Sequence, residues 1–165
     1  MEPGEALGIA AQIAVALAGF AGVVVVFRRE AVHEWSAIDK LRLRLLLANS
    51  VVPLGLSMLG LLLLTIKPMP SGTWRLCSGI LLVATLSFVT VATKMFRRLN
   101  FQDLQRQRFT RLIYYLFGAF GAAAMLLQLY NIVLLAAFWP FFAGIVYQLV
   151  TAMAQFARMI ILVPE

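Results

Sequence analysis

Few residues of this chain have side chains that could do acid–base, nucleophilic or metal chemistry. The 165-residue sequence holds one histidine, His33, and one cysteine, Cys77. These two cannot supply the ligand sets of zinc, haem or iron–sulfur sites, and a lone cysteine forms no disulfide within its own chain. His33 follows Val32 in a polar segment, where a solvated position at a membrane interface accounts for it. We therefore expect no catalytic site, no metal and no cofactor.

Other sets of catalytic residues are also not indicated. The sequence has no glycine-rich phosphate-binding loop, no Ser/His/Asp set and no paired carboxylates inside an apolar segment. No Asp, Glu, Lys or His stands in the middle of such a segment, where proton relays and ion-coupled transporters usually keep one. The sequence predicts a protein that is neither an enzyme nor a proton-coupled pump.

The most informative polar residues lie near the C-terminal end of the sequence. They recur at intervals of three or four residues, so they share one face of one helix. This polar face of the last span consists of Gly144, Gln148, Thr151, Gln155 and Arg158. The surrounding segment is apolar enough to lie in lipid. Two glutamines and a threonine in register therefore indicate that this face meets protein or water.

Two interpretations of the polar face are open. In the first, its side chains form hydrogen bonds inside the helix bundle, with Asn49, Ser57, Gln128 or hydroxyl groups of the third span. In the second, the face lines a water-filled path or a contact between subunits, with Arg158 at the inner mouth. Neutral amides and a cation along such a path would disfavour cation selectivity.

The composition places the elements that carry these residues in a membrane. Hydrophobic residues make up 62% of the chain and charged residues 13%, and the mean hydropathy is +0.92. Soluble domains are about 45–50% apolar and about one quarter charged, so a soluble core of this size could not cover so much apolar surface. We expect an all-helical, polytopic transmembrane bundle that forms a single integral membrane domain over residues 1–165.

Five apolar segments are long enough to cross a bilayer, which takes about 20 helical residues. They cover about residues 7–27, 43–66, 76–93, 112–130 and 140–161. The first is expected to be a retained span and not a signal peptide, because no Lys or Arg precedes it. The link at 131–139 is apolar for a loop, so it is either a loop or part of a span. A bundle of four spans is the alternative.

Small residues indicate where helices approach one another. The stripe in the first span is Ala11, Ala14, Ala18 and Gly22, and the fourth span adds Gly118 and Gly121. Small side chains let two helix backbones come close, and this contact drives association in lipid. The stripe is consistent both with general packing between helices and with a dedicated self-association face.

Basic residues predict the orientation. Eleven of the fourteen Lys and Arg residues lie in the connections after the first and third spans, whereas Lys67 and Arg75 lie on the opposite side. The positive-inside rule then places the N-terminus outside and the C-terminus in the cytoplasm. Candidates for contact with anionic lipid headgroups or an acidic partner are Arg28, Arg29, Arg97, Arg98, Arg106, Arg108 and Arg111. The net charge of +7 thus indicates a membrane surface and not nucleic acid.

Function follows less directly from these patterns. We expect a non-enzymatic protein of a bacterial-type inner membrane that acts through helix–helix association. It would associate with itself or serve as a small subunit of a larger membrane complex. The alternative is a homo-oligomeric channel or membrane-permeabilising protein, with the polar face of the last span lining its path.

Overall fold

Five long helices make up most of the described chain. The structure is a computed structural model, and it describes residues 1–27, 35, 37–66, 72–97 and 108–161. The helices are α1 (Pro3–Phe27), α2 (Ala37–Thr65), α3 (Thr73–Arg97), α5 (Arg108–Tyr130) and α6 (Phe138–Ile161), and a short π-helix, η1 (Asn131–Leu135), follows α5. No strand occurs within these ranges.

All five helices are long and apolar enough to cross a membrane. The segments that meet this criterion are Pro3–Val26, Asp39–Thr65, Thr73–Val91, Tyr115–Leu135 and Phe138–Ile160. The prediction of an all-helical bundle with five helices of membrane-spanning length is confirmed. The second helix starts at Ala37, before the apolar segment predicted at 43–66, so its first turn carries charged residues.

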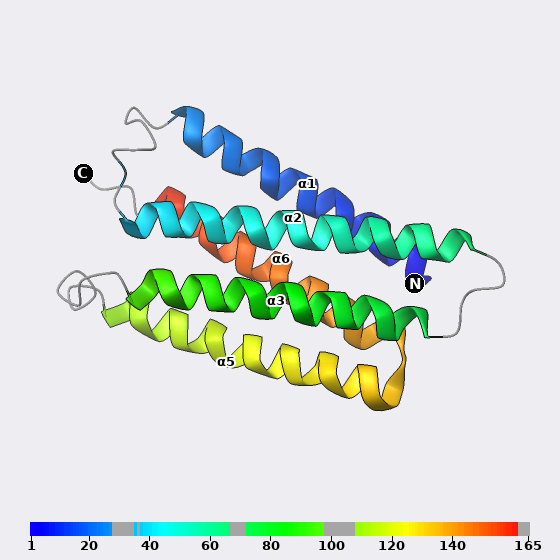
Figure 1. Ribbon diagram of the computed structural model, residues 1–165. Helices are drawn as coiled ribbons and strands as arrows, with labels where there is room; N and C mark the ends of the chain where they lie inside the picture. The colour runs from blue at the N-terminus through cyan, green and yellow to red at the C-terminus, as the bar shows by residue number, and fades with distance from the viewer. Residues whose placement is uncertain (28–34, 36, 67–71, 98–107, 162–165) are drawn as a thin grey trace.

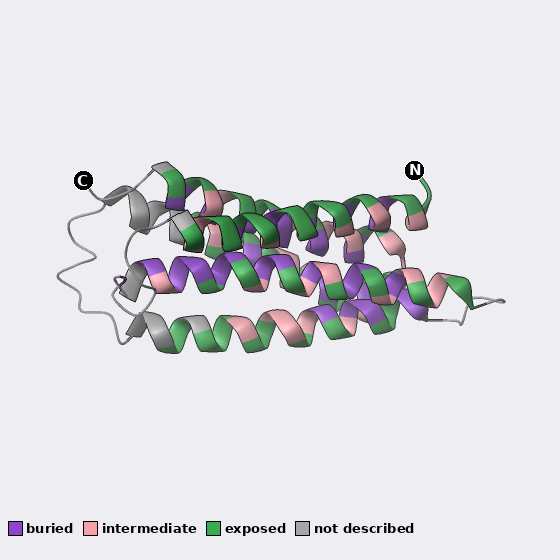
Figure 2. Ribbon diagram, turned by 90° about the horizontal axis from the view of Figure 1, so that it is seen from above, coloured by how far each residue is buried: buried purple, intermediate pink, exposed green. Residues whose placement is uncertain are grey.

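Helix α6 is the centre of the bundle. It contacts each of α1, α2, α3 and α5. Figure 1 shows it running behind α2 and α3, between the α1–α2 pair and the α3–α5 pair. In the apolar stretch of α6, 50% of the residues are buried inside the chain. The corresponding share is 17% for the segment Tyr115–Leu135. Neighbouring helices cover only part of α6, because Val150 and Met153 on its other side are exposed. Its polar side chains can therefore lie against protein, and Figure 2 shows buried and exposed residues along each helix.

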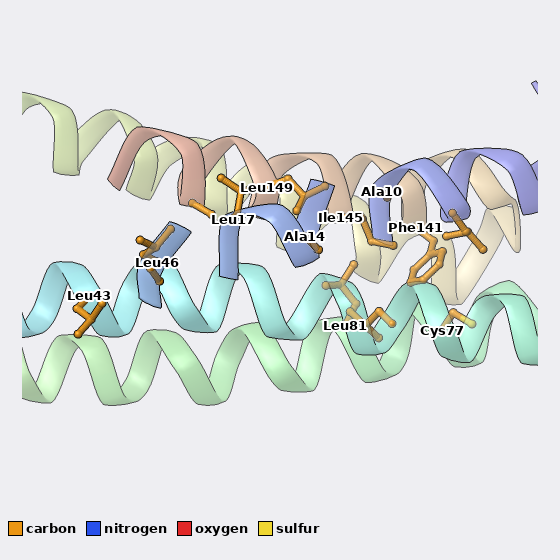
Figure 3. Packing of buried hydrophobic residues seen from close by; sticks show 14 of the residues in the cluster. Ala10, Ala14, Leu17, Leu43, Leu46, Cys77, Leu81, Phe141, Ile145 and Leu149 are labelled. Carbon is orange, nitrogen blue, oxygen red and sulfur yellow. The ribbon is translucent and has the colours of Figure 1, made fainter. Parts of the chain in front are cut away.

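The main core lies where α1 and α2 meet α6. Phe141, Ile145 and Leu149 of α6 are almost completely buried there (Figure 3). Helix α1 meets them with a face of leucines and alanines, namely Leu7, Ala10, Ala14, Leu17 and Ala21. The alanines let α1 approach closely, and the leucines supply most of the apolar surface that this face removes from lipid or water.

This face of α1 differs from the predicted small-residue stripe. Of the predicted residues, Ala14 is buried and Gly22 is exposed. Ala11 and Ala18 are half-buried. Small residues occur on every side of α1, so they do not define one face by themselves. The helix is rotated so that Leu17 enters the core, because a leucine makes more packing contacts than an alanine.

The link between α5 and α6 is mostly helical. Helix α5 continues into η1, which ends at Ala136 in the left-handed conformation with φ 50° and ψ 33°. Helix α6 begins two residues later at Phe138, so little of the predicted link 131–139 is a loop. The side chain of Asn131 accepts a hydrogen bond from the N–H of Ala137 at 2.9 Å and donates one to the carbonyl of Ala137 at 3.0 Å. It thereby satisfies backbone groups that lipid could not.

Candidate functional site at the polar face of the last span

The polar face of the last span lies inside the bundle. All five of its residues are buried; Gln148 is 5% exposed, Gln155 is 2% exposed and Arg158 is 9% exposed. Helix α6 has neighbours on several sides, so these side chains contact protein of the same chain. The residues that the spacing places on one face are therefore brought together in the interior.

Gln148 joins α6 to α3. Its Nε2 donates a hydrogen bond to Oγ1 of Thr85 at 3.2 Å, and that hydroxyl donates to the carbonyl of Leu81 at 2.8 Å. A threonine that donates to its own helix keeps lone pairs with which it can accept. This contact is interhelical bonding of the kind in the first interpretation, with a hydroxyl of the third span as partner.

A second amide joins α5 to α6. Nε2 of Gln128 donates to the carbonyl of Pro140 at 2.7 Å. Gly144 leaves the room for this contact, because a Cβ at that position would lie 2.8 Å from Nε2 of Gln128 and 2.5 Å from Cδ2 of Leu81. The glycine of the polar face is thus required by the close approach of α3, α5 and α6.

A small cavity lies beside these two amides. Its volume is about 10 Å³, and its lining includes Leu81, Thr85, Gln128 and Gln148. The Oε1 atoms of both glutamines are buried and accept no hydrogen bond from the described residues. About 10–15 Å³ is the space that one water molecule needs. The cavity therefore matches a single water molecule, and not a continuous path through the bundle.

Toward the C-terminal end of α6, the polar face continues with Thr151, Gln155 and Arg158. Oγ1 of Thr151 donates to the carbonyl of Tyr147 in its own helix at 2.9 Å. Oε1 of Gln155 is buried with no hydrogen-bond partner in the described ranges. This end of the face retains unused hydrogen-bonding capacity.

Besides these hydrogen bonds, the described residues include a buried ion pair on α2. Nη1 of Arg42 lies 3.2 Å from Oδ1 of Asp39, one turn away at the start of α2. In the described part of the chain, His, Cys, Asp and Glu side chains form no group of three that could hold a metal ion. The polar face itself consists of neutral groups apart from Arg158. Its neutral amides and hydroxyl can join helices or contact a polar solute.

Two polar contacts that position α6 were not predicted. Nδ2 of Asn131, which is completely buried, donates to Oγ of Ser78 at 2.7 Å and so attaches the α5–α6 turn to α3. The hydroxyl of Tyr147 donates to the carbonyl of Phe117 at 2.7 Å, and a Cβ at Gly121 would lie 2.7 Å from that hydroxyl. An amide within an apolar run was the signal for Asn131, whereas no sequence pattern marks Tyr147.

The other predicted contact residues fall in different places. Gly121 is buried beneath Tyr147, whereas Gly118 is exposed, with no atom within 4 Å of an added Cβ. At the end of the bundle where α6 finishes (Figure 1), the last turn of α3 and the first turns of α5 contain Arg97, Arg108 and Arg111. Four predicted residues lie outside the described ranges: Arg28, Arg29, Arg98 and Arg106.

Comparisons of the chain with protein-family models, with curated proteins and with solved structures found no match.

Proposed function

We propose that this chain is a non-enzymatic, multi-pass protein of a bacterial-type inner membrane that acts through helix–helix association. It associates with itself or is a small subunit of a larger membrane complex. Its N-terminus faces the outside and its C-terminus the cytoplasm. Exposed cations support this orientation, because Arg44 at the start of α2 and Lys94 near the end of α3 lie at the same end of the bundle.

The proposal depends mainly on glycines that lie on helix faces turned away from the rest of the bundle. A Cβ added at Gly19, Gly22 or Gly118 would meet no atom within 4 Å. Packing within the chain therefore does not require these residues to be small, in contrast to Gly121 and Gly144. Small residues on a lipid-facing surface are what close contact with another helix needs. The outward faces of α1 and α5 are the association surfaces of this proposal.

The contacts of α6 support the same assignment. Its polar side chains are buried among helices of this chain, and Gln148 already has Thr85 as a partner. Association through the polar face of α6 would require the bundle to open. Association through α1 or α5 leaves the bundle intact.

Anionic lipid headgroups are the second partner in this proposal. The described cations at the end of the bundle where α6 finishes include Lys40, Arg44 and Lys94. Each basic residue near an anionic membrane surface contributes about 1 kcal/mol of attraction. We assign no role in nucleic-acid binding to these residues, because they flank spans and would lie at the membrane surface.

A homo-oligomeric channel or membrane-permeabilising protein is the second candidate. The buried, unpartnered Oε1 atoms of Gln148 and Gln155 favour it, because such acceptors would be satisfied along a hydrated path. Thr151 and Arg158 would complete the lining. The cavity beside Gln148 measures about 10 Å³, so the path would form only after α3 and α5 move relative to α6.

The mass of the particle extracted gently in native lipid tests these candidates. Association predicts a mass of two or more 18.3 kDa chains, or a particle with other membrane proteins. A ring of identical chains that conducts solutes in liposomes would favour the channel. A monomeric particle, at the protein-to-lipid ratio of the native membrane, would contradict both the association proposal and the channel.

A further inference from the structure

Gln12 is a polar side chain in a helix that is long and apolar enough to cross a membrane. It is exposed on α1, in an otherwise apolar and small-residue segment. Successive residues of an α-helix are separated by about 100°, so Gln12 lies about 160° around the helix from Ala10 and from Ala14. Both alanines are buried in the core. Gln12 is therefore at the middle of the outward face of α1.

The depth of Gln12 prevents its amide from reaching water. The spanning segment is Pro3–Val26, and Gln12 is within three residues of its midpoint. At about 1.5 Å per residue, this places its backbone about 4 Å from the centre of the bilayer. The hydrocarbon extends about 15 Å from that centre. The remaining distance of about 11 Å is farther than a glutamine side chain can extend.

Nothing in the described part of the chain satisfies this amide. Within the described residues, the side chain of Gln12 makes no hydrogen bond and no ion pair or ring contact. An amide has two donors and an acceptor that can bond twice, and lipid tails offer no partner to any of them. A group in this position is stabilised by an amide or hydroxyl of another helix.

The residues around Gln12 allow a second helix to come close. Gly8, Ala16 and Gly19 lie four residues before, four after and seven after Gln12, so they share its face. Ala16 and Gly19 are exposed, and a Cβ at Gly8 or Gly19 would meet no atom within 4 Å. The same chain therefore leaves a small-residue surface and an unbonded amide at one place.

We propose that this face of α1 is the contact of a two-fold symmetric dimer, in which Gln12 of one protomer bonds Gln12 of its partner. The inference rests on the proposed association function and names the partner as a second copy of this chain. Two copies inserted with the same orientation are related by an axis along the membrane normal, which makes the two α1 helices parallel. Each residue near the axis then faces its own copy.

Self-pairing fits the chemistry of the amide. A glutamine is both donor and acceptor, so two identical side chains can exchange two hydrogen bonds across the axis. A charged partner would leave either the donors or the acceptor of Gln12 unused. Gly8, Ala16 and Gly19 then meet their own copies and let the backbones approach. A dimer about this axis also leaves α6 and its buried contacts unchanged.

Cysteine cross-linking in native membranes tests the contact. In a Cys77→Ala background, we would introduce Gln12→Cys, Gly19→Cys or Ala14→Cys and add an oxidant without detergent. Dimers linked at positions 12 and 19, with none at the buried position 14, are expected. Ala122→Cys is the matched control, because Ala122 is an exposed small residue on α5. No link at position 12, or equal linking at position 122, would overturn the contact.

A second measurement isolates the amide. Gln12→Leu keeps the size of the side chain and removes its hydrogen bonds, so the dissociation constant of the dimer in liposomes should rise about tenfold. Thr90→Val is the control, because the exposed Thr90 bonds only to its own helix, at the carbonyl of Leu86. Unchanged dissociation of Gln12→Leu would contradict the role of the amide.

The outcomes separate this inference from the function on which it rests. A particle that contains other membrane proteins, or a dimer linked through position 122 and not 12, removes the α1 dimer and leaves the association function. A particle that stays monomeric removes both.

Discussion

The side-chain amide of Asn131 donates a hydrogen bond to the hydroxyl of Ser78 at 2.7 Å. These residues are 53 positions apart, and both are completely buried. The same asparagine bonds the N–H and the carbonyl of Ala137. One side chain therefore fixes the turn between α5 and α6 and attaches it to α3. The hydroxyl of Ser78 and the N–H and carbonyl of Ala137 all bond to Asn131, so replacing Asn131 removes the partner of all three groups.

Asn131→Ala should lower the free energy of unfolding by about 2–3 kcal/mol, because it leaves the backbone groups of Ala137 unbonded in an apolar setting. Ser78→Ala removes one bond and should lower it by about 1 kcal/mol. Reversible unfolding in mixed micelles measures both values. Thr90→Val, which alters an exposed hydroxyl of α3, should have no comparable effect. Equal losses for Asn131→Ala and Ser78→Ala would contradict the central role of the asparagine.

Gly121 and Gly118 form a matched pair on α5. A Cβ at Gly121 would lie 2.7 Å from the hydroxyl of Tyr147, so Gly121→Ala must displace it and break its 2.7 Å bond to the carbonyl of Phe117. We expect a loss of about 1–3 kcal/mol in the free energy of unfolding. Gly118→Ala meets open space and should leave the stability of the monomer unchanged or slightly raised. The two variants should be compared in thermal unfolding; similar melting temperatures would refute the prediction.

The bond between Gln148 and Thr85 distinguishes interhelical bonding from pore lining. Gln148→Leu and Thr85→Val should each destabilise the bundle by about 1 kcal/mol, and the double variant should be destabilised by less than the sum. A coupling energy of about 0.5 kcal/mol or more would establish the contact. Solute flux in liposomes is the second readout. A decrease in flux with Gln148→Leu, at unchanged stability, would instead support the channel.

The orientation can be tested with two single cysteines. Glu2 and Lys94 are exposed and lie at opposite ends of the bundle, at the start of α1 and near the end of α3 (Figure 1). A membrane-impermeant maleimide should label Glu2→Cys in intact spheroplasts and Lys94→Cys only after permeabilisation. Cys77 is completely buried and serves as an internal unreactive site. Labelling of both cysteines from one side would contradict the five-span arrangement.

Hydropathy and helical spacing predict much of this structure. The five apolar segments correspond to five helices of spanning length because bilayer thickness sets the length of each one. The register of Gln148, Thr151 and Gln155 places them together, since residues three and four apart share a face. These features depend on local geometry, and local geometry is encoded in short stretches of sequence.

The contacts between distant segments could not be predicted in the same way. Thr85 is one of several hydroxyls on α3, and like Thr90 and Thr93 it donates to a carbonyl of its own helix. Which hydroxyl meets Gln148 depends on how the two helices cross. The buried face of α1 depends similarly on where Leu17 fits between α2 and α6, because alanines and glycines occur all around that helix. Packing partners decide these choices.

The central position of α6 has a consequence for biosynthesis. This helix leaves the ribosome after every helix that it contacts. Until it inserts, the hydroxyl of Thr85 has no Gln148 to accept from, and the amide of Gln128 has no Pro140 carbonyl to bond. The α1–α2 hairpin can form early, whereas α3 and α5 must wait in the bilayer for their common neighbour. Nascent chains that stop before Phe138 should therefore be substrates for membrane proteases, and attachment of α6 is the step that completes assembly.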